Sequence, residues 1–533
     1  MEPNLRNRIV KLLLLATFYA TLVSAAKKID FDSATIADLN RAFDAGTLTS
    51  EKLVQLCLAR IKAYDHQGPH LNAVLTINPK ALEIARALDA ERKAKGPRSP
   101  LHGIPVVLKD NYNTFDMPTT GGSVLLEGSI PPADAFVVKK LREAGAIIFA
   151  KVNMSEFAAA GAYSSLGGQS RNPYDLARTP SGSSGGTGVS IAADYAPIGL
   201  GTDTGGSIRG PATTNGVVGL RPTIGLLSRS GIIPLALSFD TGGPFGRHVY
   251  DVAAALGVMT GADPGDPATR TSEGKFAKDY TTGLNPNALK GARIGIARDF
   301  MGADPDVDWV VGTAIDAMRR AGATVVDVRC PKWLLEVRTE FYDAVRWPEF
   351  PVQIAQYLAT LGPKYPKNLD EMIERAERFT IARTDGARPN ASRWALFKTE
   401  AASGTMDDYR YKSVHDFGLP LVRAAVEGIF AAQRLDAIVY PTSPRRPTLI
   451  AAPPNAGGGV GSATNIASLC GFPDLVVPAG FTGDALPVGI SFFGLAFSEQ
   501  KLLSLGYSFE QATKARSLPI NTPPLDGEKI SLP

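Results

Sequence analysis

Cysteine and histidine are scarce in this sequence of 533 residues. The three cysteines, Cys57, Cys330 and Cys470, lie far apart and form no C-x-x-C pair. An odd and scattered set of this kind indicates neither a disulfide framework nor a cysteine-rich zinc site. Of the five histidines only His66 and His70 are close together, in a loop-like stretch without a neighbouring cysteine. Because this falls short of the usual zinc-ligand spacings, we predict no metal site.

The chain also lacks a strong excess of charge of either sign. It has 56 lysines and arginines against 52 aspartates and glutamates, a net charge of +4, and no run of like charges stands out. A nucleic-acid-binding protein would carry a basic patch or stripe, so we expect no nucleic-acid partner. No phosphate-loop motif is present, and Gly199, Gly201 and Gly205 miss the G-x-G-x-x-G spacing of a dinucleotide site. We therefore predict no cofactor.

The N-terminal apolar run, residues 12–23, is shorter than the ~20 residues that a membrane-spanning helix needs. Arg8 and Lys11 precede it, and the small-residue pattern Val-Ser-Ala follows at 23–25. A basic head, a short apolar core and small residues are typical of a secretory signal peptide. We therefore predict a signal peptide over residues 1–25, no stable membrane span, and a secreted or periplasmic location. The alternatives are an uncleaved membrane anchor and a buried N-terminal helix.

After this segment, helix-like and strand-like stretches alternate, which is typical of an α/β protein with a parallel or mixed sheet. Short apolar runs predict strands at 103–108, 146–150, 195–201, 436–440, 475–477 and 488–492, and periodic stretches predict helices at 134–143 and 499–513. Residues 330–420 are rich in Trp, Tyr, Arg and Glu, which predicts a mainly helical insertion in one domain spanning 26–533. Its tryptophans, Trp333, Trp347 and Trp394, either line a substrate pocket or fill the core between helices.

Serine and glycine concentrate in two segments, PSGSSGG at 180–186 and GTDTGGSIR at 201–209. Small residues this dense allow close approach to a ligand, although such stretches are also common flexible loops. Residues 182–186 fit G-x-S-x-G, the nucleophile elbow of α/β-hydrolases. That elbow follows directly on a strand, whereas residues 172–180 are polar and contain two prolines. The elbow interpretation is therefore weak.

Taken together, the motifs resemble those of the amidase-signature family. The resemblance rests on GIPVVLKD at 103–110, SGSSGG at 181–186 and GTDTGGSIRGPA at 201–212, and it extends through KVNMSEFA at 151–158 and PVGISFFG at 487–494. It covers nearly the whole chain after the signal peptide. It implies the amidase-signature fold, in which a mixed central sheet is covered by helices.

The resemblance also implies an unusual catalytic triad, with Ser207 as nucleophile, Ser183 as a bridging serine after a cis peptide bond, and Lys109 as base. A serine hydroxyl attacks only when a base removes its proton. Lysine is a base only when neutral, so its pKa must fall from ~10.4 to near 7. Burial disfavours the ammonium form, and Lys109 directly follows the apolar run Val-Val-Leu.

An oxyanion hole is expected from backbone N–H groups just before an apparent helix start near Ile208. The candidate donors are Thr204, Gly205, Gly206 and Ser207. We expect Asp203 and Arg209 to brace this turn as an ion pair, and Ser184 to hold the relay serine in place. One departure from the family pattern is Ser181, where many members have glycine.

The function that this resemblance implies is an exported serine amidase acting on small carboxamides or peptide C-terminal amides. The acyl-serine intermediate would be hydrolysed to an acid, with release of ammonia or an amine. The run DPGDPATR at 263–270 favours the peptide-amidase-like branch. Two alternatives are a glutamyl-tRNA amidotransferase A-like subunit, which needs partner chains, and a fatty acid amide hydrolase-like enzyme. A catalytically dead binding protein is a third, which the presence of all three triad residues disfavours.

Overall fold

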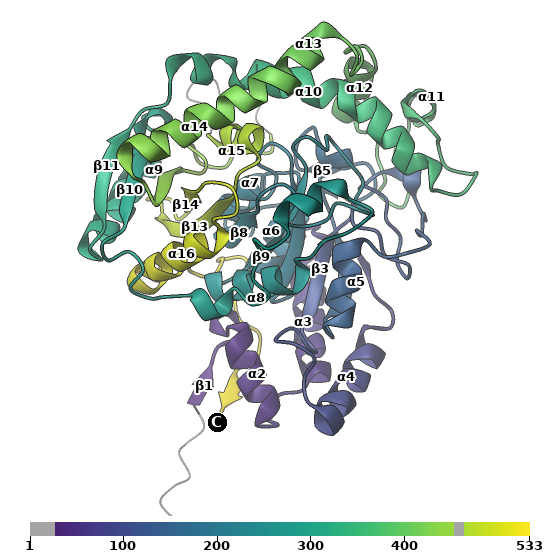
Figure 1. Cartoon of the computed structure of the whole chain (residues 1–533). Coiled ribbons are helices and arrows are strands. Elements are labelled where there is room, and N and C mark those ends of the chain that lie inside the picture. The colour runs from purple at the N-terminus through teal and green to yellow at the C-terminus, as the bar shows by residue number, and fades with distance from the viewer. Residues whose placement is uncertain (1–26, 452–462) are drawn as a thin grey trace, which may run out of the picture.

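An eleven-stranded mixed sheet runs through the protein, whose computed structural model describes residues 27–451 and 463–533 (Figure 1). The predicted signal peptide lies outside these described residues. The strand order is β11-β10-β12-β14-β13-β8-β9-β7-β3-β4-β2. The strands are β2 (Val74–Ile77), β3 (Pro105–Lys109), β4 (Ile147–Val152), β7 (Ile198–Asp203), β8 (Val218–Arg221), β9 (Thr241–Gly246), β10 (Arg293–Ala297), β11 (Thr324–Val328), β12 (Ala437–Pro441), β13 (Asp474–Phe481) and β14 (Pro487–Phe493).

The predicted α/β class with a mixed sheet is confirmed. Strand β3 pairs in parallel with β4 and β7, and β10 pairs in parallel with β11 and β12, whereas the other pairs are antiparallel. All six predicted strands are present, with boundaries shifted by a few residues. Strand β9 was not predicted, because its sequence TGGPFG holds three glycines and a proline and has no apolar run. Two short antiparallel pairs complete the strands, β1 (Lys27–Ile29) with β15 (Ile530–Leu532) and β5 (Tyr163–Ser164) with β6 (Gly168–Gln169).

Helices cover both faces of the sheet. Successive side chains of a strand point to opposite faces, and in β3 Val106 and Leu108 belong to one buried cluster while Val107 belongs to another. The covering helices are α2 (Ile36–Asp44), α3 (Ser50–Tyr64), α4 (Ala81–Lys95), α5 (Phe136–Glu143), α6 (Gly185–Ala192), α7 (Arg209–Thr214), α8 (Val249–Met259), α9 (Pro305–Arg320), α15 (Thr464–Cys470) and α16 (Glu499–Thr513). The predicted helices at 134–143 and 499–513 are confirmed as α5 and α16.

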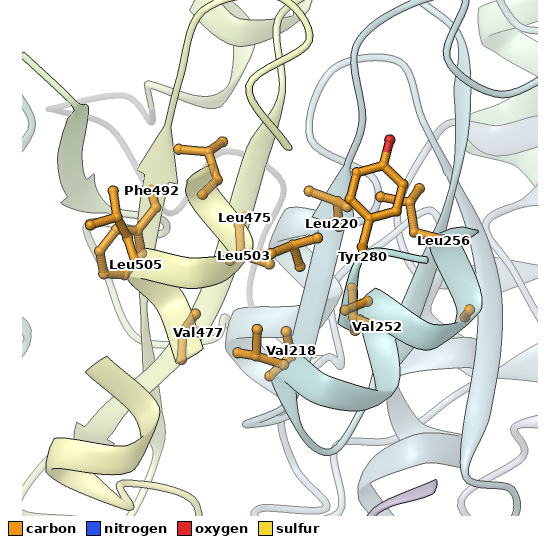
Figure 2. Close-up of a cluster of buried hydrophobic side chains, with 14 of the residues drawn as sticks. Val218, Leu220, Val252, Leu256, Tyr280, Leu475, Val477, Phe492, Leu503 and Leu505 are labelled. Carbon is orange, nitrogen blue, oxygen red and sulfur yellow. The ribbon is translucent and has the colours of Figure 1, made fainter. Parts of the chain in front are cut away.

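One of these apolar layers joins strands β13 and β14 to strand β8 and helix α8 (Figure 2). Leu475 and Phe492, from β13 and β14, lie in the same buried cluster as Leu220 of β8 and Leu256 of α8. Leu503 of α16 packs between these groups. Burial of each side chain of this size stabilises the folded state by roughly 1.5–3 kcal/mol. The layer therefore keeps the strands that carry the site residues in a fixed relative position.

The stretch from 332 to 433, which includes the predicted insertion, is built of helices that lie across the top of the molecule in Figure 1. They are α10 (Lys332–Ala359), α11 (Leu369–Arg378), α12 (Ala391–Ala401), α13 (Tyr409–Lys412), a π-helical turn (Ser413–Gly418) and α14 (Leu419–Gln433). Within residues 27–451 and 463–533, no helix is both long enough and apolar enough to cross a bilayer.

A buried ion network ties together the elements around the serine-rich motifs. Asp203, at the end of β7, pairs with Arg209 of α7 at 2.9 Å and with Arg221 of β8 at 2.8 Å. Arg209 also pairs at 2.9 Å with Asp474, the first residue of β13. Burial alone would raise the pKa of Asp203, but the two guanidiniums outweigh it and hold that pKa well below its ordinary value. Since all four side chains are fully buried, each charge depends on its partners.

We predict that Asp203→Ala lowers the free energy of unfolding by about 3–5 kcal/mol, because it leaves two buried guanidiniums without their shared carboxylate. Asp327→Ala is the matched control, since the Asp327–Arg298 pair lies on the surface and such pairs contribute about 1 kcal/mol or less. Equilibrium denaturation of both variants measures the difference. Equal losses would show that the buried network does not stabilise the fold.

Candidate active site

Lys109 ends strand β3 and its side chain is fully buried. Its Nζ lies 2.7 Å from Ser183 Oγ and 2.7 Å from Thr202 Oγ1. Burial lowers the pKa of Lys109 to about 7, although the negative charges of Asp203 and Asp240 oppose this effect. A large fraction of this lysine is therefore neutral near pH 7 and has a lone pair that can accept a proton.

Ser183 contacts two other segments of the chain, Lys109 at the end of β3 and Ser155. The peptide bond between Gly182 and Ser183 is cis, as the family resemblance implied. The carbonyl of Ser183 accepts a hydrogen bond from the N–H of Ser155 at 3.0 Å. A Cβ atom at Gly182 would lie 2.3 Å from Ser155 Oγ, so a larger residue there would require the Ser155 hydroxyl to move. Ser183 is thus fixed within reach of Lys109.

Ser207 lies in the wall of a pocket of about 460 Å³, next to Gly205 and Gly206. The structure records no hydrogen bond for Ser207 Oγ among the residues it describes, which leaves this hydroxyl open to the pocket. The carbonyl of Ser207 accepts from the N–H of Ser184 at 3.2 Å, so the two serine-rich segments meet here. The structure therefore brings Lys109 and both serines to one place.

The turn before Ser207 differs in one respect from the expectation based on the sequence. The N–H of Gly206 donates to Asp203 Oδ1 at 2.9 Å, and the N–H of Ile208 donates to Asp203 Oδ2 at 2.9 Å. The expectation that the Gly206 N–H is an oxyanion-hole donor is therefore corrected. In the structure this N–H donates to the buried Asp203 carboxylate within the turn. The amides of Thr204, Gly205 and Ser207 have no acceptor among the described residues.

Asp203 and Arg209 form the expected pair, which is fully buried. The pair also links the turn to strands β8 and β13 through Arg221 and Asp474. The sequence did not indicate a partner for Ser184, and in the structure its side chain bonds to the backbone of Thr202. Its Oγ donates to the carbonyl of Thr202 at 3.2 Å and accepts from the N–H of Thr202 at 3.3 Å. Ser184 therefore fastens the Ser183 segment to strand β7 through the backbone of Thr202.

Two polar residues beside Lys109 were missed by the sequence reasoning. Thr202 Oγ1 lies 2.7 Å from the Lys109 side-chain nitrogen and also accepts from Asn111 Nδ2 at 3.0 Å. Asn111 comes two residues after the lysine, and Thr202 stands inside the glycine-rich motif. The available signal was their position, since Asn111 closely follows the strand that ends at Lys109 and Thr202 directly follows the strand predicted at 195–201.

The outer wall of the pocket comes from the helical stretch. Tyr342 and Arg346 of α10 and Leu396 of α12 line it together with residues of the serine-rich turns. None of the three tryptophans of this stretch is among the described residues that line the pocket. Trp347 instead lines a separate cavity between α10, α12 and the loop that follows α12. A volume of about 460 Å³ is in the normal range for a small-molecule site.

Comparison with known proteins agrees with this geometry. The family model described as Amidase matches residues 52–503. A probable amidase of Arabidopsis thaliana is 34% identical over 525 residues, covering 95% of each chain. The A-type subunit of the glutamyl-tRNA(Gln) amidotransferase from Deinococcus radiodurans is 36% identical, covering 89% of this chain and 96% of that protein. The crystal structure of native peptide amidase from Stenotrophomonas maltophilia superposes with a TM-score of 0.83 at 38% identity, covering 91% of this chain and 98% of the other.

The family match covers most of the chain, and the relatives exceed 30% identity over nearly their whole length. The sequence motifs, the mixed sheet and the pocket all lie within the matched region. The chain belongs to the amidase-signature family, and it is an enzyme that hydrolyses amide C–N bonds.

Proposed function

We propose that Ser207 is the nucleophile, Ser183 the proton relay and Lys109 the base of an acyl-serine amidase. The observation that carries this proposal is the buried contact of 2.7 Å between Lys109 Nζ and Ser183 Oγ, at the side of the Ser207 pocket. A neutral lysine has two N–H bonds and one lone pair. Its hydrogens can point to the hydroxyl and carbonyl oxygens of Thr202, at 2.7 and 3.4 Å, which leaves the lone pair for Ser183.

In the first half of the reaction, Ser207 Oγ attacks the carbonyl carbon of the amide. Its proton passes to Ser183 Oγ, while the proton of Ser183 passes to Lys109, because a hydroxyl can donate and accept at once. The tetrahedral intermediate then loses its nitrogen, and the same relay returns a proton to that nitrogen. Water repeats the sequence on the acyl-serine and releases the acid.

Charge that develops on the carbonyl oxygen needs donors that are already in place. The amides of Thr204, Gly205 and Ser207 lie at the turn beside the nucleophile and have no acceptor among the described residues. Asp203 fixes this turn through the amides of Gly206 and Ile208. Each preorganised donor of this kind contributes about 3–4 kcal/mol to the transition state.

Small carboxamides and peptide C-terminal amides are the substrate classes we propose. The structural similarity to a peptide amidase, at 38% identity and over 91% of the chain, supports this choice. A second candidate function is that of an amidotransferase A-like subunit, which the 36% identity to the relative from Deinococcus radiodurans favours. We also propose that the enzyme is exported, on the signal-peptide pattern at residues 1–25. Export favours the first candidate, because it would separate the enzyme from the partner chains that an amidotransferase subunit needs.

We predict that Ser207→Ala lowers amide turnover at least about a thousandfold, because no other group can form the acyl intermediate. Ammonia release is measured from C-terminally amidated peptides, aliphatic amides, aromatic amides and glutamine. Ser33→Ala, at an exposed serine far along the chain from the motifs, is the matched control and should retain full activity. Turnover by Ser207→Ala at the wild-type rate would rule out this mechanism, and activity on glutamine alone would favour the amidotransferase-like function.

The pH profile tests the role of Lys109. Its pKa is lowered to about 7, so the neutral, active form predominates above that pH. We predict that kcat/KM rises with pH through about 7 and then levels off, with a tenfold loss for each pH unit below the pKa. Lys109→Met should abolish turnover at every pH. A wild-type profile that stays flat from about pH 5 to 9 would contradict a lysine base.

Export is tested at the N-terminus of the mature protein. We predict that cells with a secretory pathway release a chain that begins near residue 26, after the Val-Ser-Ala pattern at 23–25. Intact mass and N-terminal sequencing of the secreted protein measure this. Val23→Arg, which breaks the pattern, should retain the full-length chain. A secreted wild-type protein that begins at Met1 would contradict the prediction.

A further inference from the structure

We propose that Arg346 is a binding residue for a carboxylate on the acyl part of the substrate, about four to six bonds from the scissile amide. This deepens the proposed amidase function and rests on it. Arg346 lines the same pocket as Ser207, and its side chain is only 6% exposed. A guanidinium in such a place recognises a planar anion through paired hydrogen bonds.

The position of Arg346 follows from helix α10. Tyr342 lies over the reacting end of the pocket, because a Cβ atom at Gly205 would be 2.8 Å from the Tyr342 hydroxyl oxygen. Arg346 follows Tyr342 by four residues, and residues at this spacing share a helix face about 6 Å apart. Its side chain therefore borders the pocket about one helical turn beyond the nucleophile's turn.

Arg346 shares its carboxylate partner with a second arginine. Its Nη2 donates to Glu400 Oε1 at 2.6 Å, but Glu400 Oε2 also accepts from Arg393 at 2.8 Å. Arg393 is fully buried and lies over the rings of Phe350 and Phe397. Glu400 is thus shared by two guanidiniums. The other carboxylates that act on this pair are Glu156, near Arg393, and Asp343, near Arg346, and neither is among the described residues that line the pocket.

The pocket itself offers no other charge to offset that of Arg346. Among the described residues that line the pocket there is no aspartate or glutamate, and Arg346 is the charged one. Asp343 lies on the same helix but lines the neighbouring cavity. Within the described part of the chain, the hydrogen bond to Glu400 is the one recorded for the Arg346 guanidinium, so its other N–H groups remain for a ligand.

The chemical class of the substrate follows from the distance between its scissile amide and its carboxylate. We take the Cβ–Cβ spacing of about 6 Å between Tyr342 and Arg346 as the scale of the pocket between the reacting end and the guanidinium. An extended chain advances roughly 3.5 Å for every three bonds, so this length corresponds to about five bonds. Glutaramate, the monoamide of a five-carbon dicarboxylic acid, has this length. A peptide amide with an acidic side chain near its C-terminus presents the same group. A cationic group at this position meets like charge and is disfavoured.

The test compares glutaramate with pentanamide and 5-aminopentanamide, which share its chain length but end in a methyl and an ammonium group. We expect wild-type kcat/KM for glutaramate to exceed that for pentanamide at least about tenfold, since a guanidinium–carboxylate hydrogen bond is stronger than a neutral one. The amine should be the poorest of the three. Arg346→Met should lower kcat/KM for glutaramate at least about tenfold more than it lowers kcat/KM for pentanamide, so that the ratio of the two values falls to about one. Arg338→Met, on the same helix but not among the described pocket residues, should retain the wild-type ratio.

A second measurement needs no variant. Glutarate and pentanoate are compared as inhibitors of the wild-type enzyme, with the fastest amide of the panel as reporter, and glutarate should bind at least about tenfold more tightly. If amides are hydrolysed but glutarate and glutaramate show no preference over their neutral counterparts, the role of Arg346 is overturned. If no amide of any class is hydrolysed, the proposed function itself fails, which is a separate outcome.

Discussion

The carboxylate of Asp203 is the group on which the site geometry depends. It pairs with two buried arginines, Arg209 and Arg221, and accepts from the amides of Gly206 and Ile208. One side chain thus joins the end of β7 to β8, to α7 and to the turn that carries Ser207. Because a buried ion is costly without partners, this arrangement has little freedom to relax. The shape of the turn follows from that constraint.

Strand β7 also contacts the lysine that we propose as the base. Asp203 ends β7, and Thr202 just before it contacts Lys109 from the neighbouring strand β3. Burial lowers the pKa of the lysine to about 7, even though nearby carboxylates oppose the effect. The protein therefore places a partly neutral lysine in contact with Ser183, at the side of the pocket that Ser207 lines. The buried arginines that neutralise Asp203 limit how far its negative charge can restore the ammonium form.

The helices from α10 to α14 have a different role from the sheet. The sheet and the serine-rich turns hold the groups that the family resemblance identifies, whereas α10 and α12 supply the far wall of the pocket. Tyr342 and Arg346 come from α10, and Leu396 comes from α12. Substrate choice within a shared mechanism is therefore expected to reside in this helical part of the chain. The three tryptophans, although conspicuous in the sequence, are not among the described residues of the pocket wall.

The sequence by itself determined the α/β class and the six apolar strands, because apolar runs are local patterns. Its small-residue motifs carry the family resemblance that implied the candidate triad. It could not show that Thr202 contacts both Lys109 and Asn111, that Asp203 accepts from the Gly206 amide, or that Arg346 shares a pocket with Ser207. Lys109 and Ser183 are 74 positions apart, and Lys109 and Thr202 are 93 apart. Such contacts arise only when the order of strands in the sheet and the packing of α10 are set, and no local period carries that information.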